Sequence, residues 1–317
     1  MKNTNRSVYA LVVAMLLCLQ MQAQQPFTVM AYNVENAFDT IHDEGKTDEV
    51  FCPGGIMKWN KFRLFEKLRG ICKVIAAADE HRPVDLIGLC EVENDTVMQY
   101  LTKRTPLAQI GYEYVMTNSD DKRGIDVALL YSPFTFHPVG TWCIKPNIPE
   151  HPTRDILHVA GTIANGDTVD VYVLHLPSKL GGAAALARSI TVTRQLQHDV
   201  DSVLTARKKP NVIIMGDFNA GNNSQQIKIM TNNRLTTDIT RKLKPGTYRW
   251  RGEWATLDHI LVHTTSLKHT KARILQLPYL LEPDPNHGGK KPIFTYYGPV
   301  YHGGISDHLP VVANFRF

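Results

Sequence analysis

The chain has 317 residues, of which 43% are hydrophobic and 21% charged, and its formal net charge is +5. This length allows one large domain or two ordinary ones and is long enough to bury a sizeable core. The mild positive charge suits a phosphate-bearing substrate, but it excludes the dense basic surface of a dedicated nucleic-acid-binding protein.

The first 23 residues have the pattern of a secretory signal peptide. Lys2 and Arg6 give a charged start, residues 8–19 form a short apolar run, and Ala23 is a small residue suited to cleavage. The apolar run is too short to predict a membrane span. Removing the signal takes away two basic residues and no acid, so the formal charge falls from +5 to +3. We expect an exported protein, periplasmic or extracellular, without stable membrane insertion.

Hydrophobic periodicity predicts more strands than helices in the remaining chain. Helices are expected at 59–78, at 96–104, over the long periodic segment 186–203, and at 223–231. Irregular loops are expected at 41–57 and 278–292. Strands are expected at 27–34, 84–92, 112–116, 126–131, 134–139, 156–163, 168–174, 212–214, 247–250, 258–263, 270–276 and 311–317.

This order of elements predicts two sheets packed face to face with helices outside. No repeat or flexible linker divides the chain, so we expect a single domain over 24–317 and a monomer. On the helix at 59–78, five basic residues lie away from the apolar stripe and are interpreted as a solvated face. They are Lys61, Arg63, Lys67, Arg69 and Lys73.

The four cysteines that follow the signal do not have the spacing of a zinc motif. Cys72 and Cys90 lie in apolar segments and are expected in the core, whereas Cys52 and Cys143 lie elsewhere in the chain. Export permits disulfides, and the sequence leaves the pairing open.

Polar residues cluster where the apolar strands end. A lone Asp in such a place is usually a turn former, but seven such sites in one chain are hard to explain by turns. Loops at strand ends are where function tends to lie, so we predict one shared catalytic site. The seven sites are Asn33 with Glu35, Glu91, Arg123 to Asp126, His175, Asp217 with Asn219, Asp258 with His259, and Asp307 with His308.

These residue types suit metal-assisted hydrolysis of a phosphate ester. Hard oxygen ligands such as Glu91, Asp307 and the amide of Asn33 favour Mg²⁺, with Mn²⁺ or Ca²⁺ as alternatives. No set of thiolates or three histidines indicates zinc. A histidine backed by a carboxylate can take a proton from water. A second histidine, or the metal, can stabilise the charge that builds on the phosphate and the leaving group.

The motifs, in this order, resemble those of the endonuclease/exonuclease/phosphatase superfamily, which has the deoxyribonuclease-I-like fold. Gly216-Asp217-Phe218-Asn219 followed by Ser306-Asp307-His308-Leu309-Pro310-Val311 is specific in combination, and the similarity runs from Asn33 to the closing strand. The segment from Asn33 to Asp39, with Lys58-Trp59 downstream, resembles a secreted bacterial branch. The resemblance implies an α+β fold: a four-layer αββα sandwich of two mixed β-sheets flanked by helices.

The resemblance also implies a role for each position. Glu91 would be the main metal carboxylate, supported by Asn33, and Asp307 would lie near the metal or hold the His308 loop. His308 would act as general base or bind the phosphate, with Asp258 orienting it. The remaining roles fall to three residues of the strand ends: Asp217 would position the attacking water, Asn219 would bind a phosphate oxygen, and His175 would contact the phosphate.

Five further residues are open to two interpretations. Arg123 and Lys179 either contact an anionic substrate or are solvated, and Trp250 either stacks on a base or packs in a hairpin with its aromatic and basic neighbours. Asp126 either orients His175 or is a strand-edge acid. His259 alternates with Asp258 along a strand and is interpreted as structural.

The motifs define the reaction better than the substrate. The first hypothesis is a secreted phosphodiesterase, a nuclease acting on DNA or RNA. The second is a phosphatase or phosphodiesterase for a small molecule or a lipid head group, for which residues 277–281 are the apolar segment available to meet a membrane. The third is an inactive binding module on the same fold. A missing acid or histidine would support the third hypothesis, but every motif residue is present.

Overall fold

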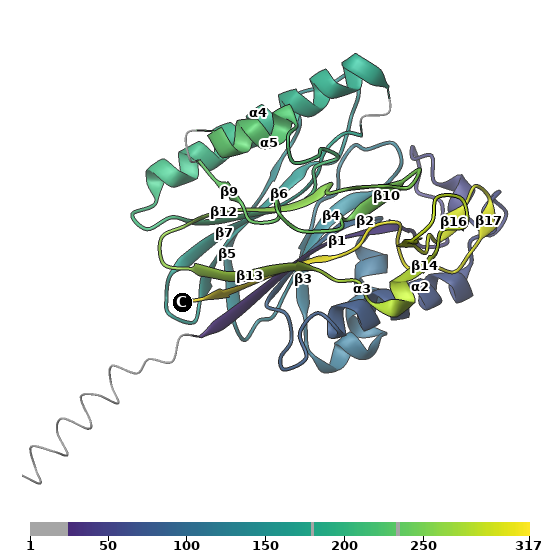
Figure 1. Ribbon diagram of the computed structural model, residues 1–317, viewed down its shortest axis with the longest axis horizontal. Coiled ribbons are helices and arrows are strands. Elements are labelled where there is room, and N and C mark those ends of the chain that lie inside the picture. The colour runs from purple at the N-terminus through teal and green to yellow at the C-terminus, as the bar shows by residue number, and fades with distance from the viewer. Residues whose placement is uncertain (1–24, 179–180, 233–234) are drawn as a thin grey trace, which may run out of the picture.

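The computed structural model describes residues 25–178, 181–232 and 235–317. The predicted signal peptide and Lys179 lie outside these residues. Two large sheets lie face to face in the middle of the molecule, with helices on both outer sides (Figure 1). The predicted α+β sandwich of two mixed sheets flanked by helices is therefore confirmed.

The first sheet brings the beginning and the end of the described chain together. Its six strands in the described ranges are β1 (Pro26–Ala37), β2 (Leu86–Val92), β3 (Glu113–Met116), β4 (Asp126–Tyr131), β13 (Lys268–Ile274) and β18 (Val311–Arg316). They lie in the order β13-β18-β1-β2-β4-β3. β1 pairs in parallel with β2, so the carboxyl ends of these two strands point to the same edge of the sheet.

The second sheet is also mixed and has a parallel pair at its centre. Its strands within the described residues are β5 (Phe136–Ile144), β6 (Ile156–Ile163), β7 (Thr168–His175), β8 (Asn211–Asp217), β9 (Thr237–Asp238) and β12 (Asp258–Thr264). They lie in the order β5-β6-β7-β8-β12-β9, with β7 and β8 parallel. β5 runs five residues beyond the predicted 134–139 strand, because its pairing with β6 continues past a bulge at Pro138–Gly140.

Helices cover the outer faces of the sheets. α4 (Gly182–Ala206) and α5 (Gln225–Thr231) lie over the second sheet, and α2 (Lys61–Ala76) and α3 (Asp95–Lys103) lie on the opposite side of the molecule (Figure 1). Val192, Leu196 and Val200 of α4 pack on the outer face of the second sheet. The side-chain oxygens of Asn60 and Asn94 accept from the backbone N–H of the third residue of α2 and α3, so each helix begins at a capping residue.

The inner faces of the sheets form one continuous apolar core. Gly88 of β2 lies directly under the other sheet: a Cβ there would come within 3.0 Å of Met215 and 3.2 Å of Val173. Apolar residues on both inner faces are fully buried. Burial of this kind stabilises the fold by about 25 cal/mol for each Å² of apolar surface removed from water. The core thereby fixes the strand ends that carry the polar motifs.

Short elements replace the irregular loop predicted at 278–292. This region contains η4 (Pro278–Leu280), β14 (Leu281–Pro283) and β15 (Lys290–Pro292). Further short elements of the described chain are η1 (Glu49–Phe51), η2 (Pro106–Gln109), β10 (Tyr248–Trp250), β11 (Glu253–Ala255), β16 (Tyr296–Tyr297) and β17 (Val300–Tyr301). β10 and β11 form a hairpin.

The predicted solvated face of the first helix is wrong for Lys67. This side chain is 3% exposed, and its ammonium donates to Thr295 Oγ1 at 2.6 Å and to the Ile305 carbonyl at 3.0 Å. The segment around residues 293–305 packs over this part of α2, which local periodicity cannot reveal.

The four cysteines are free thiols in the structure, and Cys72 and Cys90 are buried as predicted. Among the described residues, no helix has the length and apolar character needed to cross a membrane.

Candidate active site

The predicted site residues come together at one edge of the sandwich. Asn33 and Glu91 lie at the carboxyl ends of β1 and β2, and His175 and Asp217 end β7 and β8. His175 is in register with Asp217, and Asp217 is in register with Asp258, the first residue of the antiparallel β12. Because the carboxyl ends of parallel strands share an edge, both sheets deliver polar side chains to the same place.

Glu91 is turned toward this edge by a local irregularity of its strand. The register between β2 and β4 shifts at Cys90–Val92, and Glu91 has φ = 64°. A left-handed backbone costs about 1–2 kcal/mol for such a residue, so the surrounding structure must hold it. The Asn36 N–H donates to Glu91 Oε2 at 2.9 Å, and an Arg123 amino group lies 3.5 Å from the same oxygen. Burial raises the pKa of Glu91, but the charge of Arg123 and the hydrogen bond from Asn36 help to keep this pKa below its ordinary value.

The amide of Asn33 joins the two sheets. Its Nδ2 donates to Asp217 Oδ2 at 3.1 Å and to Glu91 Oε1 at 3.4 Å, and its oxygen accepts from the Glu35 N–H at 3.0 Å. The amide thus holds two carboxylates in place. A direct role of Asn33 as a metal ligand stays a prediction.

The Gly-Asp-Phe-Asn segment forms the end of β8 and the two residues that follow it. Gly216 has φ = 135°, and a Cβ there would meet the Leu174 carbonyl oxygen at 2.0 Å, so only glycine fits. The Asn219 N–H donates to Asp217 Oδ1 at 2.7 Å, and Asn219 Nδ2 donates to the Leu176 carbonyl at 3.0 Å. Both side chains of the motif are thereby fixed against the end of β7.

His308 and Asp258 form a buried pair. His308 Nδ1 donates to Asp258 Oδ2 at 2.7 Å, and His308 Nε2 lies 3.9 Å from Asp217 Oδ2 and 4.0 Å from Asp307 Oδ1. Burial lowers the pKa of His308, but Asp258 and Asp307 outweigh it and raise the pKa well above its ordinary value. The Ser306 hydroxyl donates to the Asn33 carbonyl at 2.6 Å and accepts from the His308 N–H at 3.0 Å, which locks the loop onto β1.

His175 lies between the two sheets, with an arginine behind it that the sequence reasoning missed. His175 Nε2 is 3.5 Å from Asp217 Oδ2 and 4.0 Å from Glu91 Oε1. Burial, together with the positive charges of Arg154 and Arg123, holds the pKa of His175 well below its usual range, so the ring is neutral. Arg154 is buried and donates to the carbonyls of His175 and Leu176 at 3.2 and 2.8 Å. Arg154 lies two residues before the first residue of β6. This position next to a strand is the only feature of the sequence that could have indicated a place in the site.

Several buried carboxylates lie together in the site. Burial, followed by repulsion from other carboxylates, raises the pKa of Asp217 and of Asp307 to about 6 although His308 opposes the shift. Glu91 is part of the same group of acids. Carboxylate oxygens in this density are the donors that a hard divalent cation prefers, and its charge would relieve the repulsion. Glu91 and Asp307 offer oxygen donors of this kind and line one cavity.

A second set of possible ligand atoms lies beside the first. One ligand atom from each of Asp217, Asp258 and His308 lies within 4.8 Å of the others. In this set, however, Asp258 and His308 already bond to each other.

The site opens into a cavity of about 600 Å³. Its wall includes Arg123, Tyr248, Trp250 and Leu257, beside the acids and histidines described above. Trp250 is 59% exposed on the β10–β11 hairpin, and the ring of Tyr248 lies 4.9 Å from that of His308. The cavity therefore joins a charged, catalytic end to an aromatic rim.

Two of the residues left open by the sequence, and one neighbour of Trp250, have structural roles. Asp126 accepts from Thr117 Oγ1 and the Ser119 N–H, so it holds a turn rather than His175. His259 is buried and bonds to Asp238 and to the Ala220 carbonyl, as its structural interpretation predicted. Arg249, between Tyr248 and Trp250, donates to the carbonyls of Gly252, Gly288 and Lys290 and is buried in the hairpin.

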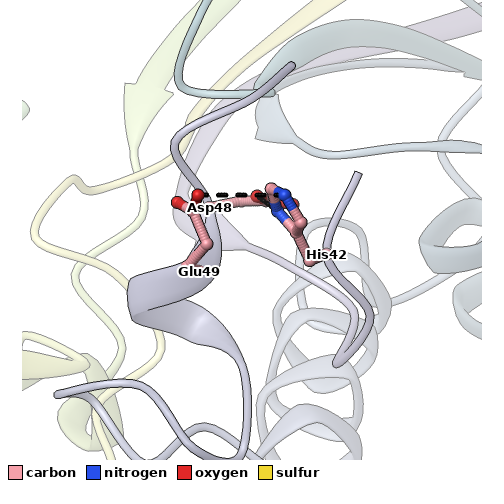
Figure 2. Close-up of side chains that lie close together, drawn as sticks. All are labelled: His42, Asp48 and Glu49. Carbon is pink, nitrogen blue, oxygen red and sulfur yellow. Dashed lines mark hydrogen bonds and ion pairs between the residues drawn. The ribbon is translucent and has the colours of Figure 1, made fainter. Parts of the chain in front are cut away.

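A separate polar cluster anchors the loop after β1. Figure 2 shows His42 facing Asp48, with Glu49 beside them. Asp48 raises the pKa of His42 through their hydrogen bond. Lys46 of the same loop donates to the Asp121 carbonyl at 2.9 Å. The contacts within the cluster account for its side chains. We therefore interpret the cluster as a structural anchor for the loop that carries Arg123.

Comparison with known proteins gives one family and no curated relative. The model of a family described as "Endonuclease/Exonuclease/phosphatase family" matches residues 28–316. No curated protein matches the sequence significantly.

Several solved structures share the fold at low sequence identity. An endonuclease/exonuclease/phosphatase family protein from Bacteroides thetaiotaomicron has 18% identity and a TM-score of 0.64, covering 93% of this chain and 98% of that one. A mannosyl-6-phosphatase from the same organism has 17% identity and a TM-score of 0.61, with 92% and 100% covered. D. rerio TDP2 complexed with a single-strand DNA product has 16% identity and a TM-score of 0.62, with 92% and 100% covered.

Proposed function

The chain belongs to the endonuclease/exonuclease/phosphatase family, whose members are metal-dependent phosphoesterases, and from this premise we propose that it is an exported nuclease. It would hydrolyse phosphodiester bonds of DNA or RNA. Export rests on the predicted signal peptide. The reaction rests on the buried constellation of acids and histidines at the shared edge of the two sheets.

The chain's own residues divide the work of an in-line attack by water. Asp217, fixed by the N–H of Asn219 and the amide of Asn33, orients the water. His308 Nε2 faces the same carboxylate, and the hydrogen bond from Nδ1 to Asp258 fixes the ring. The surrounding carboxylates favour the protonated ring, so Nε2 would accept the proton of water once the charge of a bound divalent cation offsets those carboxylates. Positioned acid–base catalysis of this kind contributes about 10²–10⁴-fold in rate.

Other side chains that line the cavity can donate hydrogen bonds to the charge that develops on phosphate. His175 is neutral and can donate from Nε2, and Asn219 and Arg123 line the same cavity. Preorganised donors in a site that excludes water stabilise a transition state far more than they would in solution. Glu91 and Asp307, with support from Asn33, would hold Mg²⁺, or alternatively Mn²⁺ or Ca²⁺. When bound, such an ion neutralises charge on the phosphoryl oxygens.

The observation that favours a nucleic-acid substrate is the aromatic rim of the cavity. Trp250 exposes 59% of its surface beside the catalytic residues, with Arg251 5.7 Å from its ring centroid. Stacking of a base on an aromatic ring contributes about 1–3 kcal/mol and tolerates any sequence. The structural neighbour TDP2, which was solved with a single-strand DNA product, supports the same substrate class.

A phosphatase acting on a small molecule is the second candidate. The cavity volume of about 600 Å³ lies within the range of small-ligand sites, and one structural neighbour is a mannosyl-6-phosphatase. A lipid substrate is less favoured because the apolar 277–281 segment is packed: Leu280 is 2% exposed, and Leu277, Tyr279 and Leu281 lie against the core. The convergence of all described motif residues argues against an inactive binding module.

The purified mature protein should be assayed with Mg²⁺ on four substrates in parallel: plasmid DNA, RNA, bis-p-nitrophenyl phosphate and p-nitrophenyl phosphate. Cleavage of DNA or RNA together with the diester supports the proposal. Turnover of the monoester alone would replace it with the phosphatase. No turnover of any of the four would refute the proposal.

A further inference from the structure

A second groove adjoins the catalytic cavity. It has a volume of about 410 Å³, and Ala255 lines both the groove and the catalytic cavity. The groove is polar: Asn222, Asn223, Ser224, Lys244 and Trp254 are among the residues that line it. A substrate longer than one unit can therefore extend from the catalytic end into this groove.

Lys244, which lines the groove, belongs to a short basic segment that the catalytic account does not use. Arg241, Lys242 and Lys244 are all exposed. None of the three forms an ion pair with an acid in the described parts of the chain; the guanidinium of Arg241 instead donates to the side-chain oxygen of Asn223 at 3.1 Å. Cations left unpaired beside a groove are available to an anionic ligand.

One residue that lines the groove also has an unused hydrogen-bonding group. Asn222 Nδ2 donates to the Arg241 carbonyl at 3.0 Å, but Asn222 Oδ1 is buried and has no hydrogen-bond partner within the described chain. A buried acceptor without a partner costs about 1–3 kcal/mol. A ligand that brings a donor, such as a sugar hydroxyl, a base amino group or an ordered water, would satisfy it.

Positive charge, neighbouring polar groups and continuity with the catalytic cavity together specify a ligand of repeating phosphates. We infer that the groove lined by Lys244, together with the neighbouring Arg241 and Lys242, binds the sugar-phosphate backbone of the strand on one side of the scissile bond. This inference rests on the proposed nuclease function. It implies that the enzyme needs more than the reacting phosphodiester for tight binding, and that this contribution is electrostatic and sensitive to salt.

The test is a double variant, Lys242→Gln with Lys244→Gln, compared with a matched double variant, Lys208→Gln with Lys209→Gln. Lys208 and Lys209 are exposed and lie before β8, at the opposite end of that strand from Asp217. Both double variants remove two surface charges. Each is assayed on a single-stranded oligodeoxynucleotide and on bis-p-nitrophenyl phosphate over a range of salt concentrations.

We expect the groove variant to raise KM for the oligonucleotide roughly five- to tenfold at low salt, with kcat unchanged. The dependence of log(kcat/KM) on log salt should lose about 0.7 for each phosphate contact removed, or about 1.4 for two contacts. Turnover of bis-p-nitrophenyl phosphate, which does not reach the groove, should stay unchanged. The control variant should match the wild type on both substrates.

Three results would overturn the inference, and they differ from one another. Equal losses on both substrates would mean that the variant damages the catalytic cavity. An unchanged KM and salt slope in an enzyme that cuts the oligonucleotide would exclude the groove as the backbone site while leaving the nuclease intact. If the wild-type enzyme cleaves neither DNA nor RNA, the proposed nuclease function is refuted, and the proposed backbone site is refuted with it.

Discussion

Lys67 offers a sharp test of how the site is supported from behind. Its ammonium is buried under the 293–305 segment and donates two hydrogen bonds, one to Thr295 Oγ1 at 2.6 Å and one to the Ile305 carbonyl at 3.0 Å. Ile305 immediately precedes the Ser306-Asp307-His308 motif. We predict that Lys67→Met, which keeps the length and the apolar stem of the side chain, destabilises the protein and slows the reaction.

The magnitude follows from the two bonds and the burial. Hydrogen bonds to a charged group contribute about 1.5–3 kcal/mol each, so their loss costs roughly 3–6 kcal/mol. Methionine avoids the cost of burying an ammonium, and this offsets part of the loss. We expect a net fall of about 2–4 kcal/mol in the free energy of unfolding. Because a misplacement of about 1 Å at a catalytic group can cost about 10²-fold, kcat should fall about 10- to 100-fold.

The assay combines urea denaturation with steady-state kinetics at neutral pH. Lys61→Met is the matched control, since Lys61 begins the same helix and is exposed; its stability should stay within about 0.5 kcal/mol of the wild type. A Lys67→Met protein as stable and as active as the control would refute the reasoning. That result would mean that Lys67 behaves as a solvated side chain, as the sequence pattern predicted.

Three further predictions concern the acids and histidines. Asp258→Asn should lower kcat about 10²–10⁴-fold with little change in KM, because His308 loses the carboxylate that sets its tautomer; an unchanged kcat would exclude this pair from the proton transfer. Glu91→Gln should weaken Mg²⁺ binding at least about 100-fold, measured by calorimetric titration; equal affinity would place the metal elsewhere. His158 is buried 3.0 Å from Asp170, and although burial opposes protonation, the hydrogen bond to Asp170 and a second carboxylate raise its pKa. Its protonated form stabilises the fold fully below the unfolded pKa of about 6.5, and this stabilisation is lost as pH rises through the higher folded pKa. His158→Gln should therefore reduce unfolding free energy more in acid than in alkaline buffer, and a pH-independent difference would contradict this assignment.

Much of the fold and the site could be predicted because it depends on local pattern. Apolar runs of four to eight residues specify buried strands, and polar side chains at their carboxyl ends must gather at the edge of the sheets. This is why Glu91, His175 and Asp217 could be identified from the sequence and are found within a few ångströms of one another.

The remaining features depend on contacts between distant segments. Lys67 lies away from the apolar stripe of its helix, yet a segment more than 220 residues later covers it. Arg154 is buried because the end of β7 supplies carbonyl acceptors. Side chains alternate between the two faces of the hairpin strand, so Trp250 and Arg249 point in opposite directions. Trp250 lines the cavity, and Arg249 bonds to a backbone carbonyl of a neighbouring segment. The sequence alone does not say which of these two faces is covered.

The measurement that tests the central claim most directly is Mg²⁺-dependent cleavage of nucleic acid by the mature protein, with EDTA treatment and His308→Ala as the two controls. The nuclease proposal predicts chain cleavage that EDTA and the substitution each abolish, with activity restored to the wild type alone when Mg²⁺ is added back. Cleavage that persists in EDTA, or a His308→Ala protein that cuts as fast as the wild type, would contradict it.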